Sequence, residues 1–242
     1  MLRSLIKGLT DIIYPATCLS CKSRLKDIAS VDNLVCAQCW SRIKKNPPPF
    51  CHCCGRHLEK KIPGKNICVK CLKAKVHFDR AFSSCIYEGV IKELIHKFKY
   101  QDKAYLGKIL SRPMIEFIKE HKLPMDYLDS VIPVPLHKTK LRERDFNQAH
   151  ILSQHVAREF NKRLLSDVLI RHRHTKTQTD LEQDLRFANV ENSFSVIKAE
   201  EIKGRNLLLV DDVFTTGATV SEAAFTLKKS GANIVFVLTL AS

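Results

Sequence analysis

The stretch from residue 206 to residue 229 constrains the fold of this 242-residue chain more than any other. Residues 207–210 are all apolar, which is typical of a strand buried on both faces of a sheet. Asp211 and Asp212 follow, then a loop of small residues, and a helical pattern runs over residues 220–229. This order predicts an α/β fold with a ligand site at the carboxyl end of the strand.

The loop after the two aspartates has the chemistry of a phosphate site. It consists of Thr215, Thr216, Gly217, Ala218 and Thr219. Backbone N–H groups and the start of the following helix can surround a phosphate, and the hydroxyl groups add donors. Gly217 lets the backbone approach a ligand or adopt a positive φ. The two carboxylates would repel a phosphate, but they suit ribose hydroxyls or a hydrated Mg²⁺. An ordinary strand–turn–helix unit with an acidic corner is the alternative.

Nine of the ten cysteines lie between positions 18 and 71, and eight of them form two CxxC–loop–CxxC units. Two such units predict two tetrahedral Cys₄ zinc sites in short ribbons. The expected Zn²⁺ ligands are Cys18, Cys21, Cys36 and Cys39 in the first site, and Cys51, Cys54, Cys68 and Cys71 in the second. Disulfides are the competing interpretation, which the lack of an export signal disfavours. Cys53 is expected to be an unused thiol beside the second site.

The formal net charge of +15 is distributed unevenly. Residues 1–80 contain 16 Lys and Arg against 5 Asp and Glu, a net +11, whereas residues 81–242 contain 24 against 20, a net +4. Two zinc ions, each held by four thiolates, lower the first value to about +7. The asymmetry favours a polyanionic partner for the first third of the chain, and a solvated basic surface is the alternative.

Beyond residue 76 strands alternate with helices, which predicts a mainly parallel sheet with helices on both faces. The expected division is an N-terminal amphipathic helix (1–17), a double zinc ribbon (18–76) and an α/β domain (77–242). The first segment lacks the features of a signal peptide. No stretch reaches the roughly 18 apolar residues of a membrane span. We therefore expect a cytoplasmic protein without a transmembrane segment.

A strongly basic segment follows the predicted strand at residues 130–135 and precedes a predicted helix at 148–160. Its cations are Lys138, Lys140, Arg142 and Arg144. Arginine side chains can hold phosphate oxygens in pairs, and the start of the next helix adds N–H donors. We interpret the segment as a pyrophosphate-binding loop.

Residues 210–219 resemble the phosphoribosyl-pyrophosphate signature of type I phosphoribosyltransferases. The resemblance implies a fold of that type. It implies that the small-residue loop binds the 5-phosphate, that Asp211 and Asp212 hold the ribose hydroxyls, and that Mg²⁺ accompanies the ligand. It further implies that the polar stretch between residues 169 and 194 is a lid. The lid residues expected to touch ligand or anchor the lid are Arg171, Arg173, Lys176, Gln178 and Arg186.

Several further motifs resemble the ComF family of bacterial competence proteins. They are Val134-Pro-Leu136, residues 142–148, and the pattern from Gln178 to Phe194. A double zinc ribbon before a phosphoribosyltransferase domain is similar to that family as well. Asp145 is a departure, because the family usually has glycine there; aspartate tolerates a positive φ better than most residues, yet it adds a carboxylate beside an anion site.

The resemblance implies a competence-associated, phosphoribosyltransferase-like protein that acts in DNA uptake and natural transformation. Its expected partners are phosphoribosyl pyrophosphate with Mg²⁺, single-stranded DNA and proteins of the competence machinery. As an enzyme it would be a phosphoribosyltransferase (a glycosyltransferase), although the sequence indicates neither general base nor acceptor. Trp40, Phe50 and Phe78 are candidates for stacking on bases. The alternative is a non-catalytic regulator that senses phosphoribosyl pyrophosphate and binds a protein partner through its ribbons.

Overall fold

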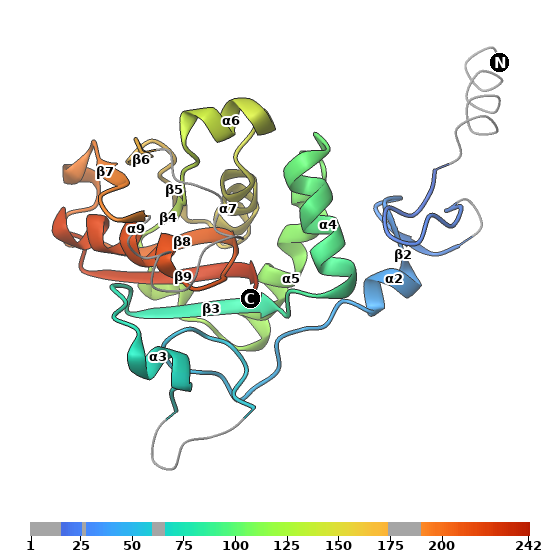
Figure 1. Ribbon diagram of the computed structural model, residues 1–242, viewed down its shortest axis with the longest axis horizontal. Helices are drawn as coiled ribbons and strands as arrows, with labels where there is room; N and C mark the ends of the chain where they lie inside the picture. Colours follow the sequence, from blue (N-terminus) through green and yellow to red (C-terminus); the bar gives the residue numbers. More distant parts are fainter. Residues whose placement is uncertain (1–15, 26–27, 60–65, 174–189) are drawn as a thin grey trace.

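A five-stranded sheet forms the centre of the molecule in the computed structural model, which describes residues 16–25, 28–59, 66–173 and 190–242 (Figure 1). The strand order is β3-β9-β8-β4-β5, and each neighbouring pair is parallel. The strands are β3 (Arg80–Cys85), β4 (Ser130–Pro133), β5 (Arg163–Leu164), β8 (Asn206–Val213) and β9 (Ile234–Ala241). The predicted parallel α/β architecture is confirmed.

The central strand β8 divides the hydrophobic core into two layers. Leu208 and Val210 pack with α4 (Gly89–Tyr100), α5 (Leu106–Glu120) and α7 (Gln148–Glu159) on one face. Leu207 and Leu209 pack with α9 (Ala218–Lys229) on the other. All four side chains are 0% exposed. Because successive side chains of a strand point to opposite faces, an unbroken apolar run is what a strand covered on both sides requires.

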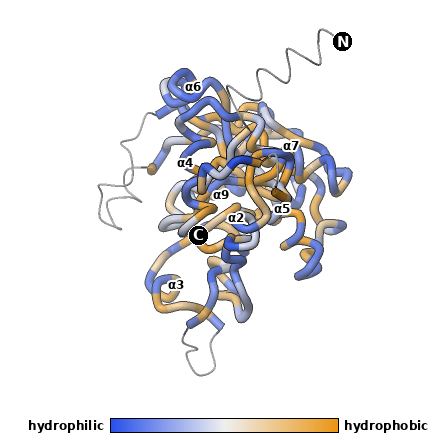
Figure 2. The backbone as a smooth tube through the Cα atoms, turned by 90° about the vertical axis from the view of Figure 1, so that its right-hand side faces the viewer, coloured by the Kyte–Doolittle hydropathy of each residue, from blue (hydrophilic) through white to orange (hydrophobic). Residues whose placement is uncertain are grey.

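The basic segment after β4 is a short helix, so the predicted loop conformation is wrong, whereas its binding of pyrophosphate stays a prediction. Helix α6 (Lys138–Arg144) begins after His137, whose ring nitrogen Nδ1 accepts a hydrogen bond from the amide of Thr139 at 3.2 Å. Lysine, leucine, arginine and glutamate are all good helix formers, which explains the difference. Asp145 ends the helix with a φ of 59°, so the positive φ expected there is confirmed. Figure 2 shows that α6 is hydrophilic.

The two zinc ribbons join opposite layers of the core. Cys18, Cys36 and Cys39 of the first ribbon belong to the layer under α4 and α5. Cys51 and Cys54 of the second belong to the layer under α9. The first ribbon contains β1 (Ser30–Val31), β2 (Val35–Cys36) and α2 (Ala37–Ser41), and the second contains α3 (Val69–Lys73).

The linker between the ribbons covers the open edge of strand β3. The amide of Asn46 donates to the carbonyl of Ser84 at 3.0 Å, and the amide of Ile86 donates to the carbonyl of Lys44 at 2.9 Å. An edge strand that is paired in this way no longer offers its backbone groups to another chain.

The remaining described elements are small. They are the antiparallel pair β6 (Leu169–Arg171) and β7 (Phe194–Val196), and the 3₁₀ turns η1 (Met125–Tyr127) and η3 (Ala199–Glu201). The predicted helix at residues 1–17 lies almost wholly outside the described residues, and so do Lys176, Gln178 and Arg186 of the predicted lid. Among the described helices, none has the length and apolarity needed to cross a bilayer.

Candidate functional site

The carboxyl end of β8 presents two adjacent carboxyl groups in different surroundings. Asp212 is 7% exposed, and its Oδ1 lies 2.9 Å from Nζ of Lys99, which comes from α4. Asp211 is partly buried, and its Oδ1 accepts a hydrogen bond from the amide of Asp212 at 2.8 Å. Lys99 was missed by the sequence analysis, because a lysine within an amphipathic helix carries no sign that it pairs with a distant strand.

The environment keeps Asp211 partly protonated near neutral pH. Burial and then the neighbouring Asp212 raise its pKa to about 7, although Lys99 and Arg171 act in the opposite direction. A cation or a hydroxyl donor that binds to such a carboxyl group stabilises its ionised form and lowers its pKa. A strongly shifted pKa beside a partner of known charge is characteristic of functional sites.

Positive side chains gather around the carboxyl pair. Burial and the charges of Arg171 and Arg144 lower the pKa of Lys140 on α6. Burial also lowers the pKa of Arg171 on β6, although the charge of Asp211 raises it. Arg144 donates to the hydroxyl of Tyr100 at 3.2 Å. Since these cations repel one another, a bound anion would relieve their repulsion.

The other predicted cations lie further out. Arg142 is exposed on α6, two residues from Lys140, and therefore on the opposite face of the helix. Lys138 is exposed at the start of α6. Arg173 donates to the carbonyl of Glu191 at 3.2 Å. Lys140 and Arg144, four residues apart, are thus the α6 cations that the structure brings together.

The segment here called the phosphate loop (residues 214–219) is built around one glycine. It consists of the turn after β8 and the first two residues of α9, so Ala218 and Thr219, predicted to lie in the loop, are helical. Gly217 has a φ of 83°, and a Cβ atom there would lie 2.5 Å from the ring of Phe214. Glycine is therefore needed both for the backbone conformation and for the space. Thr215 is exposed, Thr216 and Thr219 are partly buried, and the amide of Ala218 donates to the hydroxyl of Thr216 at 3.4 Å.

The eight expected ligands form two compact sulfur clusters. Within each group of four cysteines the Sγ atoms all lie within 4.8 Å of one another. The Sγ atoms of Cys21 and Cys36 are 3.7 Å apart, and those of Cys54 and Cys68 are 3.8 Å apart. A zinc tetrahedron with bonds of about 2.3 Å has edges of about 3.8 Å, so both clusters fit Zn²⁺. Cys53 belongs to neither cluster, and all ten cysteines are unpaired thiols.

The aromatic residues expected to stack on bases are poorly placed for it. Phe78 is 5% exposed and meets the ring of Phe214 at 6.0 Å, so its proposed stacking role is wrong. Phe50 packs against the rings of Phe117 and His121. Trp40 is partly buried against the core layer that contains α4 and α5. The sequence indicates aromatic residues but not which of them the ribbons and helices cover.

Comparison with known proteins agrees with this architecture. Residues 9–72 match the double zinc ribbon domain, and residues 147–242 match the phosphoribosyl transferase domain. The chain is 32% identical to competence protein F of Haemophilus influenzae over 93% of this chain and 96% of that protein. It is 30% identical to the DNA utilization protein YhgH of Escherichia coli K12, covering 84% and 88% of the two chains. It is 27% identical to competence protein ComFC of Bacillus subtilis, covering 90% and 91%. The chain belongs to the ComF family of competence-related, phosphoribosyltransferase-like proteins.

Proposed function

We propose that this protein binds phosphoribosyl pyrophosphate together with Mg²⁺ at the carboxyl end of β8. The observation that carries the proposal is the pair of carboxyl groups beside the cations of α4, α6 and β6. The pKa of Asp211 in this pair is raised to about 7. Carboxylate oxygens suit hydrated Mg²⁺ or ribose hydroxyls, and Lys140 and Arg144 suit the pyrophosphate. When bound, Mg²⁺ neutralises charge on the pyrophosphate group.

The phosphate loop supplies the chemistry for the 5-phosphate. It leads into α9, a helix of 12 residues whose first N–H groups carry a partial positive charge. The hydroxyl groups of Thr215, Thr216 and Thr219 add donors. A ligand with a phosphate at one end, a diol in the middle and a pyrophosphate at the other matches the order of these groups.

Thermal unfolding tests this site. Phosphoribosyl pyrophosphate with Mg²⁺ should raise the Tm of the wild type, because a ligand at 100 times its Kd stabilises the folded state by about 2.7 kcal/mol. The double variant Asp211→Asn, Asp212→Asn should fold and show no such rise. Asp126→Asn, which changes an exposed carboxylate of η1, is the matched control and should keep the full rise. A double variant that keeps the rise contradicts the site.

Such a site suits either of two alternative functions, transfer of ribose 5-phosphate or sensing of the ligand without turnover. The membership in the ComF family supports a role in DNA uptake and natural transformation in the cytoplasm, in contact with competence proteins. Release of pyrophosphate in the presence of nucleophiles separates the two functions. The sensing alternative predicts binding with no release.

We also propose that single-stranded DNA binds beside this site rather than through Phe78. Tyr100 and Tyr105 are 57% and 51% exposed. The guanidinium of Arg144 lies 5.0 Å from the ring centre of Tyr100, and Nζ of Lys103 lies 5.9 Å from that of Tyr105. Exposed rings beside cations are the usual means by which proteins hold single strands without reading sequence. The names of relatives, competence protein and DNA utilization protein, agree with such a ligand.

Fluorescence anisotropy of a labelled oligodeoxythymidine, measured over a series of salt concentrations, tests the DNA proposal. The logarithm of the affinity should fall linearly with the logarithm of salt. Tyr105→Ala should weaken binding about tenfold, since stacking of one base contributes about 1–3 kcal/mol. Tyr127→Ala is the control, because Tyr127 is 53% exposed but lies at the opposite end of β8, where its carbonyl accepts from Asn206. A flat salt dependence, or equal loss in both variants, contradicts the proposal.

A further inference from the structure

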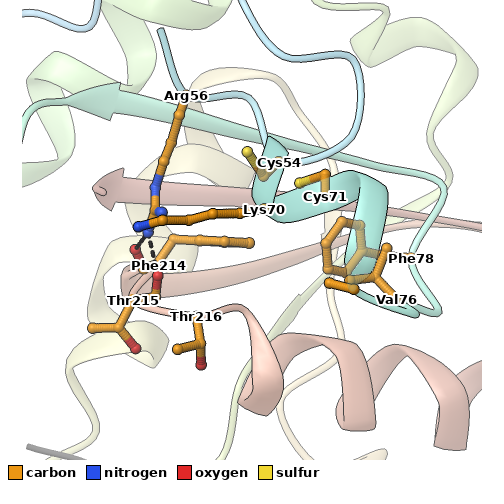
Figure 3. A pocket seen from close by; sticks show the side chains of 10 residues that line it. Cys54, Arg56, Lys70, Cys71, Val76, Phe78, Phe214, Thr215 and Thr216 are labelled. Atoms are coloured by element: carbon orange, nitrogen blue, oxygen red, sulfur yellow. Dashed lines mark hydrogen bonds between the residues drawn. The ribbon is translucent and has the colours of Figure 1, made fainter. Parts of the chain in front are cut away.

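The second zinc ribbon makes direct contact with the phosphate loop. The Nη2 atom of Arg56 donates a hydrogen bond to the carbonyl of Phe214 at 2.7 Å and another to the carbonyl of Thr215. The guanidinium also lies 5.3 Å from the ring centre of Phe214. Figure 3 shows the side chains of Arg56 and Lys70 extending from the ribbon toward this loop. One arginine therefore holds two successive carbonyl groups of the loop.

The position of Arg56 is set by the turn of residues 51–56, here called the zinc knuckle, which carries two of the cysteines of the second cluster. Its carbonyl accepts a hydrogen bond from the amide of Cys51 at 2.8 Å, and the carbonyl of Cys51 accepts from the amide of Gly55 at 3.0 Å. Cys51 and Cys54 are two of the four ligands of the second cluster. A bound zinc closes the turn that ends at Arg56, and its loss would release that turn.

The knuckle is in turn fixed to the edge of the central sheet. The amide of Ala81 on β3 donates to the carbonyl of Cys53 at 2.8 Å. The side-chain amide of the buried Asn46 donates to the carbonyls of Gly55 and Ser83 at 2.8 and 2.9 Å. A Cβ atom at Gly55 would lie 2.3 Å from the carbonyl oxygen of Ala81, so only glycine allows this approach. Arg56 is thus a fixed group and not a freely moving surface side chain.

Holding the two carbonyls has a geometric consequence for the loop. In a trans peptide the N–H points away from the C=O of the same unit. With the carbonyls of Phe214 and Thr215 directed to Arg56, the N–H groups of Thr215 and Thr216 point away from the ribbon. The positive charge at the carbonyl end also polarises these peptide units, which strengthens the N–H groups as donors.

The space between the ribbon and the loop is too small for a sugar phosphate. The cavity there measures about 40 Å³ and is lined by residues that include Arg56, Lys70, Phe78 and Thr216. A cavity of that size holds at most a few water molecules. The ribbon therefore acts on the loop through contact, which leaves the other side of the loop for the ligand.

We propose that Arg56 is a positioning residue for the phosphate loop, so that the zinc-loaded second ribbon is part of the ligand site. It orients the loop's N–H groups toward the 5-phosphate, a role that rests on the proposed binding of phosphoribosyl pyrophosphate. The described contacts of the first ribbon go elsewhere: Ser20 donates to Glu93 on α4 at 2.8 Å, and Asp32 pairs with Lys108 on α5 at 3.0 Å. Only the second zinc is expected to influence the loop.

Hydrogen exchange of the full-length, zinc-loaded protein without ligand tests the positioning directly. Arg56→Ala should speed amide exchange in the peptide that contains residues 214–219, and Arg56→Lys should restore part of the protection. Arg42→Ala is the control, because Arg42 is an exposed arginine of the first ribbon, and it should leave this peptide unchanged. Zinc content and circular dichroism establish that each variant is folded. Unchanged exchange in Arg56→Ala overturns the proposal whether or not the ligand binds.

Calorimetric titration with phosphoribosyl pyrophosphate and Mg²⁺ then links the loop to binding. Arg56→Ala should weaken affinity about tenfold or more, since a hydrogen bond from a charged donor is lost, and Arg56→Lys should recover part of it. Wild type and Arg56→Ala binding equally would overturn the inference and leave the proposed function standing. No binding by the wild type would overturn the proposed function, and the exchange result would still decide the role of Arg56.

A pair of cysteine variants separates the two metal sites. Cys71→Ser removes one ligand of the second cluster, and Cys21→Ser removes one ligand of the first. Each should lower the zinc content by about one ion per chain, because three remaining thiolates hold zinc less tightly than four. Loop exchange should rise in Cys71→Ser alone. Equal effects of the two variants would contradict a specific role of the second ribbon.

Discussion

Asp211 is expected to make the protein less stable as the pH rises. Burial and the charge of Asp212 raise its pKa from 3.8 to about 7 in the folded protein. The folded state therefore binds a proton at this carboxyl group more tightly than the unfolded state does. Between the two pKa values, stability falls as the pH increases, and it levels off above the folded-state value. Asp211→Asn keeps the shape of the side chain and cannot ionise, so this dependence should vanish in the variant.

The size of the effect follows from the two pKa values. Their difference corresponds to about 4 kcal/mol once the group is fully ionised. Of this loss of stability, about 2–3 kcal/mol falls between pH 5 and pH 8, because part of it has already occurred at pH 5. The free energy of unfolding of Asp211→Asn, minus that of the wild type, should therefore grow by about 2–3 kcal/mol over this window.

Urea unfolding of zinc-saturated protein at pH 5, 6, 7 and 8, without ligand or Mg²⁺, measures this difference. Groups that titrate in both proteins, including the zinc thiolates, cancel in the subtraction. Asp126→Asn, which changes an exposed carboxylate of η1, is the control for the loss of one negative charge. If Asp211→Asn and the wild type show parallel pH profiles, the pKa of Asp211 is not raised in the folded protein, and the reasoning is refuted.

Three further substitutions test other parts of the fold and site. Lys99→Met should lower the free energy of unfolding at pH 8 by about 3–5 kcal/mol, because it leaves the buried carboxylate of Asp212 without its partner; a loss below 1 kcal/mol would mean that the pair is solvated. Gly217→Ala should cost about 1–3 kcal/mol and weaken ligand binding through strain at positive φ, and wild-type affinity would contradict the loop geometry. Leu209→Ala should cost about 2–5 kcal/mol in urea unfolding, because the side chain is 0% exposed, whereas a cost within error would contradict its burial.

Local patterns in the sequence were sufficient to predict the strand that carries the two aspartates and the two cysteine clusters. The unbroken apolar run of residues 207–210 predicted a strand covered on both faces, and β8 is such a strand. The spacing of the cysteines predicted two zinc clusters, because CxxC pairs bring thiolates close together whatever the rest of the fold does. These signals are short in range, and short-range geometry is what a sequence pattern describes.

The contacts that complete the site were not predictable, because they join distant segments. Arg56 meets Phe214 across 158 residues, and Lys99 reaches Asp212 from a different element. Neither side chain differs in the sequence from an ordinary surface cation. The interpretation of residues 138–144 as a loop was wrong for a different reason, since a cluster of cations indicates charge and not backbone shape.

Calorimetric titration of the zinc-loaded wild type with phosphoribosyl pyrophosphate, with and without Mg²⁺, tests the central claim most directly. The account predicts one saturable site per chain, tighter with Mg²⁺ and absent in the Asp211→Asn, Asp212→Asn variant. Repeating the titration with single-stranded DNA present shows whether the two proposed sites are coupled. Absence of binding by the folded wild type, with Mg²⁺ and both zinc ions present, would contradict the claim that the carboxyl end of β8 is a phosphoribosyl-pyrophosphate site.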